Sequence, residues 1–246
     1  MAETAVFLEG KHVIWYDPDL LADVDIRFFD PLWLREAGHL TGGSTGRNTA
    51  WFLRYAGLDM VLRHYWRGGM VGRFVKDLYL REPVGNSRAM QEFSLLGWMR
   101  QQGLPVPRPV AARFTRTGLW YRADLLMELI PAARPLAEFI AEARLSEADW
   151  KRIGSVIAQM HHLGVLHSDL NCRNILLDAD GKVWLIDFDK CERRLPGKWQ
   201  KQNLDRLERS LGKEKAKNPS LNWTDLDWGA LLEGYRSGSA NQRNSE

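Results

Sequence analysis

The pattern of apolar residues changes once along this chain, near residues 129–131, and this change limits the possible folds more than any other feature. Before it, short apolar runs separated by glycine-containing turns predict antiparallel strands. After it, apolar residues recur three and four positions apart, which is typical of amphipathic helices. We therefore expect an α+β fold with two lobes: residues 1–130 form a mainly antiparallel β lobe, residues 131–236 form a short, mainly helical lobe, and residues 237–246 form a disordered polar tail.

The local signals place elements in each lobe. In the front lobe they predict a Gly-rich turn at 42–46, strands at 49–53 and 60–65, a helix from 86 or 87 to about 102, and strands near 120–121 and 125–127. In the back lobe they predict a helix opened by a capping box at 146–149, a hairpin of 175–177 with 183–186, a basic helix with Leu204, Leu207 and Leu211 on one face, and a last helix from a second capping box at 224–227 to Tyr235.

The strongest chemical signal is the sequence HSDLNCRN at 167–174, followed by DFD at 187–189. Asp169 and Asn174 fall in a loop between the long helix and the hairpin, and Asp187 follows the second strand of that hairpin. Phosphoryl transfer from ATP requires such groups: a carboxylate that orients the attacking hydroxyl, and oxygen ligands for the Mg²⁺ on the phosphates. A loop in which these side chains only stabilise a turn is the alternative, and the combined spacing favours the chemical role.

With these residues the chain resembles the protein-kinase-like fold, matching its H-x-D-x4-N catalytic loop and its D-F-G metal motif. The resemblance implies that Asp169 is the catalytic base and that Asn174 and Asp187 bind Mg²⁺. It also implies that ATP is the phosphate donor and that His167 holds the loop. The same resemblance makes residues 1–130 the nucleotide-binding lobe.

In the front lobe, the resemblance assigns seven residues to the nucleotide: Gly42, Gly43, Gly46, Arg63, Glu92, Glu128 and Ile130. The glycines stand where a phosphate-binding loop is expected. Arg63 falls on the third strand and Glu92 in the following helix, so that the two would pair and steady the phosphates. The segment 126–130 resembles the hinge, whose backbone would hold the adenine.

Three positions depart from the family pattern. The lysine of the third strand is Arg63 here, and Arg and Lys are not equivalent donors; Lys76 is the other candidate for that role. The loop reads GGSTGR rather than G-x-G-x-x-G, which changes its backbone cradle. The metal motif ends in Asp189 instead of glycine, and this carboxylate either joins the metal or faces solvent, the second being favoured.

Several features of protein kinases are missing from the sequence. Ser168 replaces the arginine of His-Arg-Asp, and no Ala-Pro-Glu motif follows Asp187. Because 59 residues follow Asp187 in the 246-residue chain, we expect no large helical subdomain for a peptide substrate. A small-molecule or glycolipid kinase is the better interpretation.

Among such enzymes the chain resembles the lipopolysaccharide-core kinase family over roughly residues 30–235. The segments that carry this resemblance are VLRHYWRGG at 61–69, GGSTGR at 42–47, HSDLN at 167–171 and DFD at 187–189. It implies phosphorylation, by ATP, of the 4-hydroxyl of a 3-deoxy-D-manno-octulosonic acid (Kdo) sugar on the glycolipid substrate Kdo–lipid IVA. The implied location is the cytoplasmic face of a Gram-negative inner membrane, with peripheral contact to the anionic membrane surface.

The charge distribution is consistent with an anionic partner. Residues 63–81 carry five basic side chains and one acidic one, and residues 191–217 carry nine and four. In the first segment Arg67, Arg73, Lys76 and Arg81 alternate with Trp66, Phe74 and Tyr79, a combination suited to a membrane surface, although these aromatics equally suit a protein core. Solvated helix faces are the alternative for the second segment. No nucleic-acid-binding motif accompanies either segment, and the longest uncharged run, 153–168, is shorter than the roughly 20 apolar residues of a spanning helix.

Two other functions compete with a glycolipid kinase. A soluble small-molecule phosphotransferase of the aminoglycoside or choline kinase type also uses His-x-Asp, but it would leave the basic aromatic segment without a partner. A pseudokinase that only binds ligands is suggested by Arg63 and by the irregular glycine loop. Phosphate transfer from ATP to the glycolipid distinguishes the three.

Overall fold

The computed structural model describes residues 4–44, 50–66 and 77–243. The chain forms two compact units, Met1–Gln101 with Pro107–Leu129, and Gln102–Val106 with Ile130–Glu246. The sequence predicts one boundary at residue 130, whereas the segment Gln102–Val106 also belongs to the second unit. A backbone hydrogen bond connects this segment to the second unit: the N–H of Leu185 donates to the carbonyl oxygen of Pro105 at 3.0 Å.

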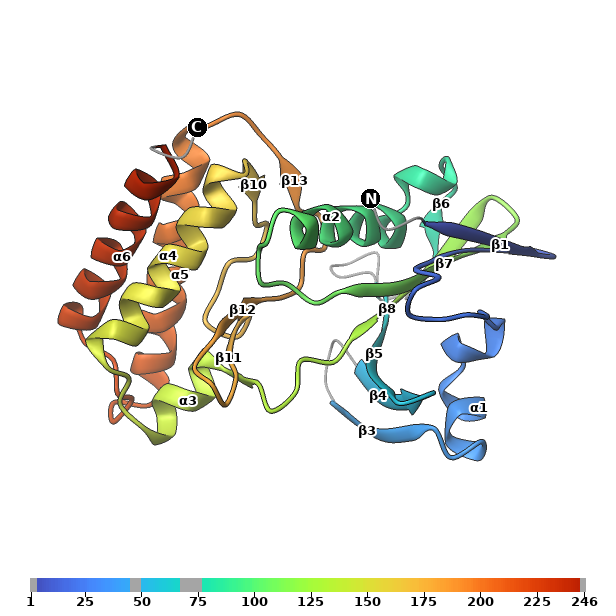
Figure 1. Cartoon of the computed structure of the whole chain (residues 1–246), viewed down its shortest axis with the longest axis horizontal. Coiled ribbons are helices and arrows are strands. Elements are labelled where there is room, and N and C mark those ends of the chain that lie inside the picture. The colour runs from blue at the N-terminus through green and yellow to red at the C-terminus, as the bar shows by residue number, and fades with distance from the viewer. Residues whose placement is uncertain (1–3, 45–49, 67–76, 244–246) are drawn as a thin grey trace. The chain divides into compact units, whose positions relative to one another are not determined.

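The first unit is built on an antiparallel sheet (Figure 1). Its strands follow the order β1-β2-β7-β8-β5-β4-β3, and β6 pairs with β8. The strands are β1 (Ala5–Glu9), β2 (His12–Tyr16), β3 (Leu40–Ser44), β4 (Ala50–Tyr55), β5 (Leu58–His64), β6 (Tyr79–Leu80), β7 (Pro109–Thr117) and β8 (Trp120–Glu128). In β5, Met60 and Leu62 are 0% and 1% exposed, and Val61 between them is only partly buried. This alternation is the two-residue period of a strand with one buried face.

Short helices accompany this sheet. They are η1 (Ile26–Phe29), α1 (Pro31–Glu36), η3 (Val84–Asn86) and α2 (Arg88–Gln101). α2 confirms the helix predicted up to residue 102, and Gly103 follows it with φ of +76°. α2 packs against β7 and β8 of the sheet. It carries Glu92, and β5 carries Arg63, the two charged residues that were expected to pair.

The first unit differs from the expectations in the glycine segment. Gly42 and Gly43 lie in β3 rather than in a turn, and they pair with Phe52 and Trp51 of β4. A Cβ on Gly43 would lie 3.0 Å from the carbonyl oxygen of Ala50, so the missing side chain permits this close strand pairing. Ser44 ends β3, and the rest of the predicted turn, Thr45 and Gly46, lies outside the described residues.

Strand β7 was not predicted, and the two short strands expected at 120–121 and 125–127 form one strand, β8. Pro109 lies at the first position of β7, where a proline does not interrupt the strand interior. β7 pairs with β8 over nearly its whole length, and this long-range pairing rather than any local signal extends both strands.

The second unit is mainly helical. Its helices are α3 (Leu136–Glu142), α4 (Glu147–His162), α5 (Lys198–Lys217) and α6 (Asp225–Arg243), and its strands are β9 (Arg134–Pro135), β10 (Val165–Leu166), β11 (Ile175–Leu177), β12 (Val183–Leu185) and β13 (Glu192–Arg193). β11 and β12 form the predicted hairpin, β9 pairs with β11, and β10 pairs with β13. α4 packs against α5 and α6 (Figure 1). The buried side of α5 contains Leu204, Leu207 and Leu211, as predicted.

The first capping box is confirmed. The N–H of Asp149 donates to the hydroxyl of Ser146 at 3.2 Å, and the Asp149 carboxylate accepts from the N–H of Ser146 at 3.1 Å. At the start of α6, the carboxylate of Asp227 accepts from the N–H and the hydroxyl of Thr224. Local sequence therefore fixes where both long helices begin.

α6 extends further than predicted because glycines let it approach α4 closely. A Cβ on Gly154 of α4 would lie 2.0 Å from the carbonyl oxygen of Leu231, and a Cβ on Gly234 of α6 would lie 2.0 Å from that of Lys151. Gly238 continues this contact beside Ser155. The prediction of a disordered tail is thus wrong for 237–243, which belong to α6, and 244–246 lie outside the described residues. None of the helices in the described ranges is long and apolar enough to cross a membrane.

Candidate active site

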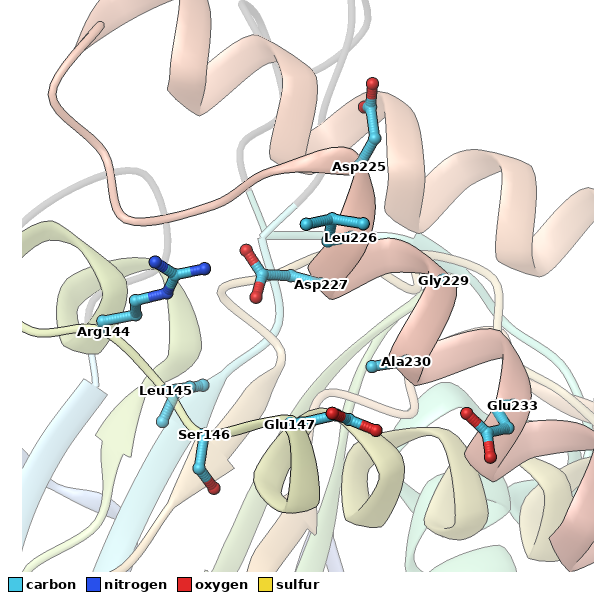
Figure 2. Close-up of a pocket in the computed structure, with 10 residues that line it drawn as sticks. All are labelled: Arg144, Leu145, Ser146, Glu147, Asp225, Leu226, Asp227, Gly229, Ala230 and Glu233. Atoms are coloured by element: carbon cyan, nitrogen blue, oxygen red, sulfur yellow. The ribbon is translucent and has the colours of Figure 1, made fainter.

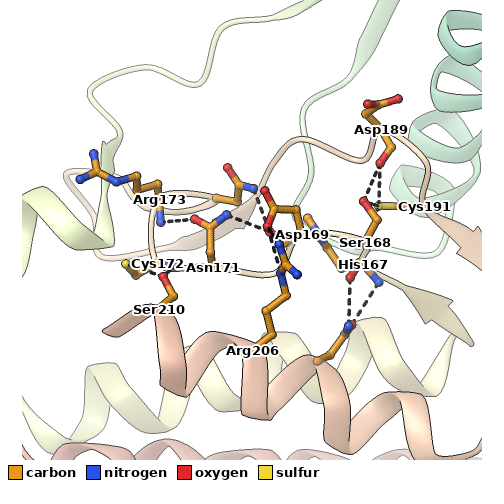
Figure 3. A network of polar contacts seen from close by, with 12 residues as sticks. His167, Ser168, Asp169, Asn171, Cys172, Arg173, Asp189, Cys191, Arg206 and Ser210 are labelled. Carbon is orange, nitrogen blue, oxygen red and sulfur yellow. Dashed lines mark hydrogen bonds and ion pairs between the residues drawn. The ribbon is translucent and has the colours of Figure 1, made fainter. Parts of the chain in front are cut away.

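The loop between β10 and β11 carries Asp169, and His167 anchors it (Figure 3). His167 is fully buried; its Nδ1 accepts the N–H of Asp169 at 3.2 Å, and its Nε2 lies 3.0 Å from the carbonyl oxygen of Ile186. Because Nδ1 accepts a hydrogen bond, the proton must be on Nε2, which donates to Ile186. Burial lowers the pKa of His167, which favours this neutral ring.

Two asparagines fix the shape of the same loop. The side-chain nitrogens of Asn171 and Asn174 each donate to the backbone carbonyl of Asp169 at 3.0 Å. Asn171 also accepts the N–H of Arg173 at 2.8 Å. The backbone around Asp169 is therefore held on both sides, while its carboxylate is half-exposed.

Asn174 and Asp187 come together because of the hairpin register. Ile175 pairs with Leu185, and one position further the N–H of Ile186 donates to the carbonyl oxygen of Asn174 at 3.0 Å. Asp187 follows directly, with φ of +64°, a conformation that non-glycine residues rarely adopt and that aspartate adopts more readily than most. The hairpin thus presents a carboxamide and a carboxylate at the same end.

These two side chains suit a magnesium ion. Mg²⁺ binds oxygen ligands and takes few from the protein when phosphates and water supply the rest. Asn174 uses its nitrogen for the bond to Asp169, which fixes Oδ1 as the atom that would bind the ion. Asp189 stands where the family motif has glycine. Its backbone carbonyl oxygen accepts a hydrogen bond from the hydroxyl of Ser168 at 2.7 Å, which connects the two segments of the site.

The sequence did not predict the partner of Asp169. Arg206 of α5 donates to Oδ1 of Asp169 through Nε at 3.0 Å and through Nη2 (Figure 3). Both side chains are 48% exposed. A pocket of about 220 Å³ lies at this pair. The one feature of the sequence that pointed to such a partner is the run of basic residues at helical spacing in the segment 191–217.

In the first unit, Arg63 and Glu92 form the expected ion pair. Glu92 is 2% exposed, and the Arg63 side chain is 14% exposed. Tyr65 completes a triangle, because its hydroxyl donates to Glu92 at 2.6 Å and accepts from Nη2 of Arg63 at 3.0 Å. Burial, and then the neighbouring Glu92, raise the pKa of the Tyr65 hydroxyl, which keeps it a donor.

The segment 126–130, which is expected to act as the hinge, begins in β8. The N–H of Glu128 donates to the carbonyl oxygen of Arg108, and the N–H of Leu129 donates to that of Asp59, both at 2.9 Å. The N–H of Glu128 is therefore already used within the first unit, and any contact of its backbone with an adenine would have to use the carbonyl oxygen. Ile130 is the first residue of the second unit after this strand.

The aromatic residues of the basic segment 63–81 have different environments. Tyr65 is buried, and the ring of Tyr79 packs tilted against that of Tyr121 with ring centroids 5.4 Å apart, so these two are part of the packing of the first unit. Trp66 is 37% exposed. Phe74, with Arg67, Arg73 and Lys76, lies outside the described residues.

A larger pocket, of about 790 Å³, lies at the starts of α4 and α6 (Figure 2). Three of its carboxylates have structural partners. Asp227 accepts from Thr224, and Glu147 and Glu233 both pair with Lys151. Since these groups stabilise the helix ends, we place the candidate chemistry at Asp169 instead.

The α+β fold and an aspartate–asparagine loop beside an aspartate-ending hairpin define a phosphotransferase of the kinase type. A family model described as "Lipopolysaccharide kinase (Kdo/WaaP) family" matches residues 32–235. The chain belongs to this family, and it is a phosphotransferase that acts on an alcohol group.

Curated relatives agree with the family over most of their length. A 3-deoxy-D-manno-octulosonic acid kinase of Vibrio parahaemolyticus serotype O3:K6 is 44% identical over 92% of this chain and 95% of that protein. Enzymes of the same name from Vibrio cholerae serotype O1 and Pasteurella multocida are 40% and 39% identical, over 94% and 85% of this chain and 97% and 90% of those proteins.

Proposed function

We propose that this chain is a Kdo kinase, which transfers the γ-phosphate of ATP to the 4-hydroxyl of the Kdo sugar in Kdo–lipid IVA. The observation that carries the proposal is the hairpin register that sets Asn174 beside Asp187, with Asp169 bonded to Asn174 through its backbone. The relatives named as Kdo kinases support the choice of acceptor.

In the second unit, Asp169 would orient the acceptor hydroxyl and take its proton as the phosphoryl group is transferred. Asn174 and Asp187 would hold Mg²⁺, which supplies positive charge that neutralises the phosphate oxygens during transfer. His167 keeps Asp169 and Asp187 in a fixed relation by its bonds to both segments.

In the first unit, we assign the remaining nucleotide contacts to the residues expected from the sequence. Arg63, held by Glu92, would bind the phosphates through the guanidinium edge that does not face the carboxylate. The carbonyl oxygen of Glu128 and the backbone of Ile130 would hold the adenine. Gly42, Gly43 and Gly46 would lie over the phosphates.

The proposed acceptor lies in a membrane, so we also propose a peripheral membrane contact. In the described part of the first unit, Leu80, Leu119 and Trp120 are 67%, 75% and 37% exposed, and together we call them the apolar patch. Leu80 pairs with Trp120, and the N–H of the exposed Arg81 donates to the carbonyl oxygen of Leu119. Apolar side chains beside a basic one suit an anionic lipid surface such as the inner leaflet of the inner membrane.

Transfer of labelled phosphate from ATP tests the proposed function. The wild-type protein should phosphorylate Kdo–lipid IVA in detergent and should not phosphorylate kanamycin or choline. Transfer to a soluble acceptor alone would instead identify a small-molecule phosphotransferase. A folded protein that binds ATP and transfers phosphate to none of the three would be a binding module.

A further inference from the structure

One face of α5 carries basic side chains beside the candidate base. The pocket of about 220 Å³ is lined by Asp169, Asn171, Arg206, Arg209, Ser210, Lys213, Glu214 and Lys217. The four basic residues are three, four and four positions apart, so they follow one stripe of the helix. The opposite stripe, with Leu207 and Leu211, is buried. The fold therefore turns the basic stripe toward the pocket.

The pocket lining has an excess of positive charge. It contains four basic and two acidic side chains. Glu214 already pairs with Lys217 at 2.9 Å and with Arg173 at 3.1 Å, and Asp169 already pairs with Arg206. Arg209 and Lys213 bring two further cations to the same lining. An anionic ligand would balance them.

The guanidinium of Arg206 can bind a second anion without releasing the first. Its Nε and Nη2 both donate to Oδ1 of Asp169. A guanidinium has five N–H donors in a rigid plane, so Nη1 of Arg206, a residue of the pocket lining, remains to donate to another oxygen. A carboxylate bound there would lie next to the candidate base.

We propose, building on the kinase function proposed above, that Arg206, Arg209 and Lys213 form the subsite for the carboxylate of the acceptor sugar. Kdo is a sugar acid whose carboxylate is on C2 of the ring that carries the 4-hydroxyl. Arg206 joins this carboxylate to Asp169 and so sets the distance between the hydroxyl and the base. The subsite selects acidic sugars over neutral ones.

The test compares two acceptors on wild type and variants. We expect Arg206→Gln to raise the KM for Kdo–lipid IVA about 10- to 100-fold, the range for a lost charge-assisted hydrogen bond, and to leave the KM for ATP unchanged. Arg206→Lys keeps the charge but loses the planar guanidinium, so its KM for Kdo–lipid IVA should lie between those of the wild type and Arg206→Gln. Lys213→Gln should raise this KM less than Arg206→Gln does. Arg134→Gln removes an exposed, ion-paired arginine of the same unit outside the pocket and should behave as wild type.

The proposal is decided by whether Arg206→Gln and a blocked Kdo carboxylate remove the same contact. Methyl esterification of the Kdo carboxylate should raise the KM of the wild type about as much as Arg206→Gln does, and should add little to the variant. Independent, multiplying effects would overturn the proposal, as would an unchanged KM in a variant with wild-type thermal stability. If the Arg206 effect disappears only when the lipid phosphates are removed, the anion bound is a phosphate and the carboxylate assignment is wrong. A wild-type protein inactive on Kdo–lipid IVA would instead refute the proposed function itself.

Discussion

His167 donates from Nε2 to the carbonyl oxygen of Ile186, 3.0 Å away. The same ring accepts the N–H of Asp169, so one buried side chain links the loop of the candidate base to the strand end that carries Asp187. Nδ1 can accept this bond only in the neutral ring that carries its proton on Nε2. Protonation of His167 would break the contact to Asp169.

Acid should therefore destabilise the second unit through its buried histidines. Burial lowers the pKa of His167, and it lowers that of His161 from 6.5 to about 4. Between these pH values the unfolded chain binds more protons than the folded protein, so the free energy of unfolding falls as the pH drops from 6.5 toward 4. For His161 the loss is about 3 kcal/mol.

Denaturant unfolding at several pH values measures this effect. The wild type should lose stability over that range, and His161→Gln should show a flatter dependence, because a glutamine does not titrate. Parallel curves for the two proteins would show that His161 does not contribute.

The ion pair of the first unit should matter for folding as well as for nucleotide binding. Glu92→Gln leaves the largely buried Arg63 without a counter-charge and should lower the free energy of unfolding by about 3 kcal/mol. The KM for ATP should rise in the same variant. Tyr65→Phe keeps the ion pair, loses its hydroxyl bonds to both residues, and should cost about 1 kcal/mol. Urea unfolding measures both variants. Equal losses of unfolding free energy in Glu92→Gln and Tyr65→Phe would show that the ion pair contributes no more than the tyrosine hydroxyl.

Close packing of α4 on α6 predicts opposite effects of alanine at two glycines. A methyl group on Gly234 would lie 2.0 Å from the carbonyl oxygen of Lys151, so Gly234→Ala should cost about 3 kcal/mol or more. On the same helix, Gly229 has open space around it, and Gly229→Ala should stabilise by up to about 1 kcal/mol because alanine is the better helix former. Thermal unfolding compares them, and a Gly234→Ala protein as stable as the wild type would contradict the packing.

The apolar patch predicts that the protein binds to a lipid bilayer through this surface. Wild type should co-sediment with vesicles of phosphatidylethanolamine and phosphatidylglycerol. Leu80→Asp and Leu119→Asp should each weaken binding about tenfold, since burying a leucine contributes about 1.5 kcal/mol or more. Leu226→Asp, at an 81% exposed leucine of α6, is the matched control. Equal weakening by all three substitutions would mean that the patch has no special role.

Elements with local signals were predictable from the sequence, and those that depend on distant partners were not. The start of α4 and the β11–β12 hairpin follow from a capping box and a turn within a few residues. β7 and the long β8 instead depend on pairing with each other. The end of α6 depends on Gly238, which lies against α4 and which looks locally like part of a polar tail.

The same distinction applies to the site. Asp169, Asn174 and Asp187 follow from spacing along 19 positions of sequence, and the hairpin register brings the last two together. Arg206 is 37 positions from Asp169, and only the packing of α5 beside the loop shows that they meet. Basic residues at helical spacing opposite Leu207 were the available sign.

Phosphate transfer by Asp169→Asn tests the central claim most directly. Asparagine keeps the size of the side chain but cannot accept the hydroxyl proton, so transfer from ATP to Kdo–lipid IVA should fall about 10²- to 10⁴-fold, at unchanged KM for ATP and with wild-type thermal unfolding. Arg134→Gln, prepared in parallel, should retain full transfer. An Asp169→Asn protein that phosphorylates Kdo–lipid IVA at the wild-type rate would contradict the assignment of Asp169 as the base.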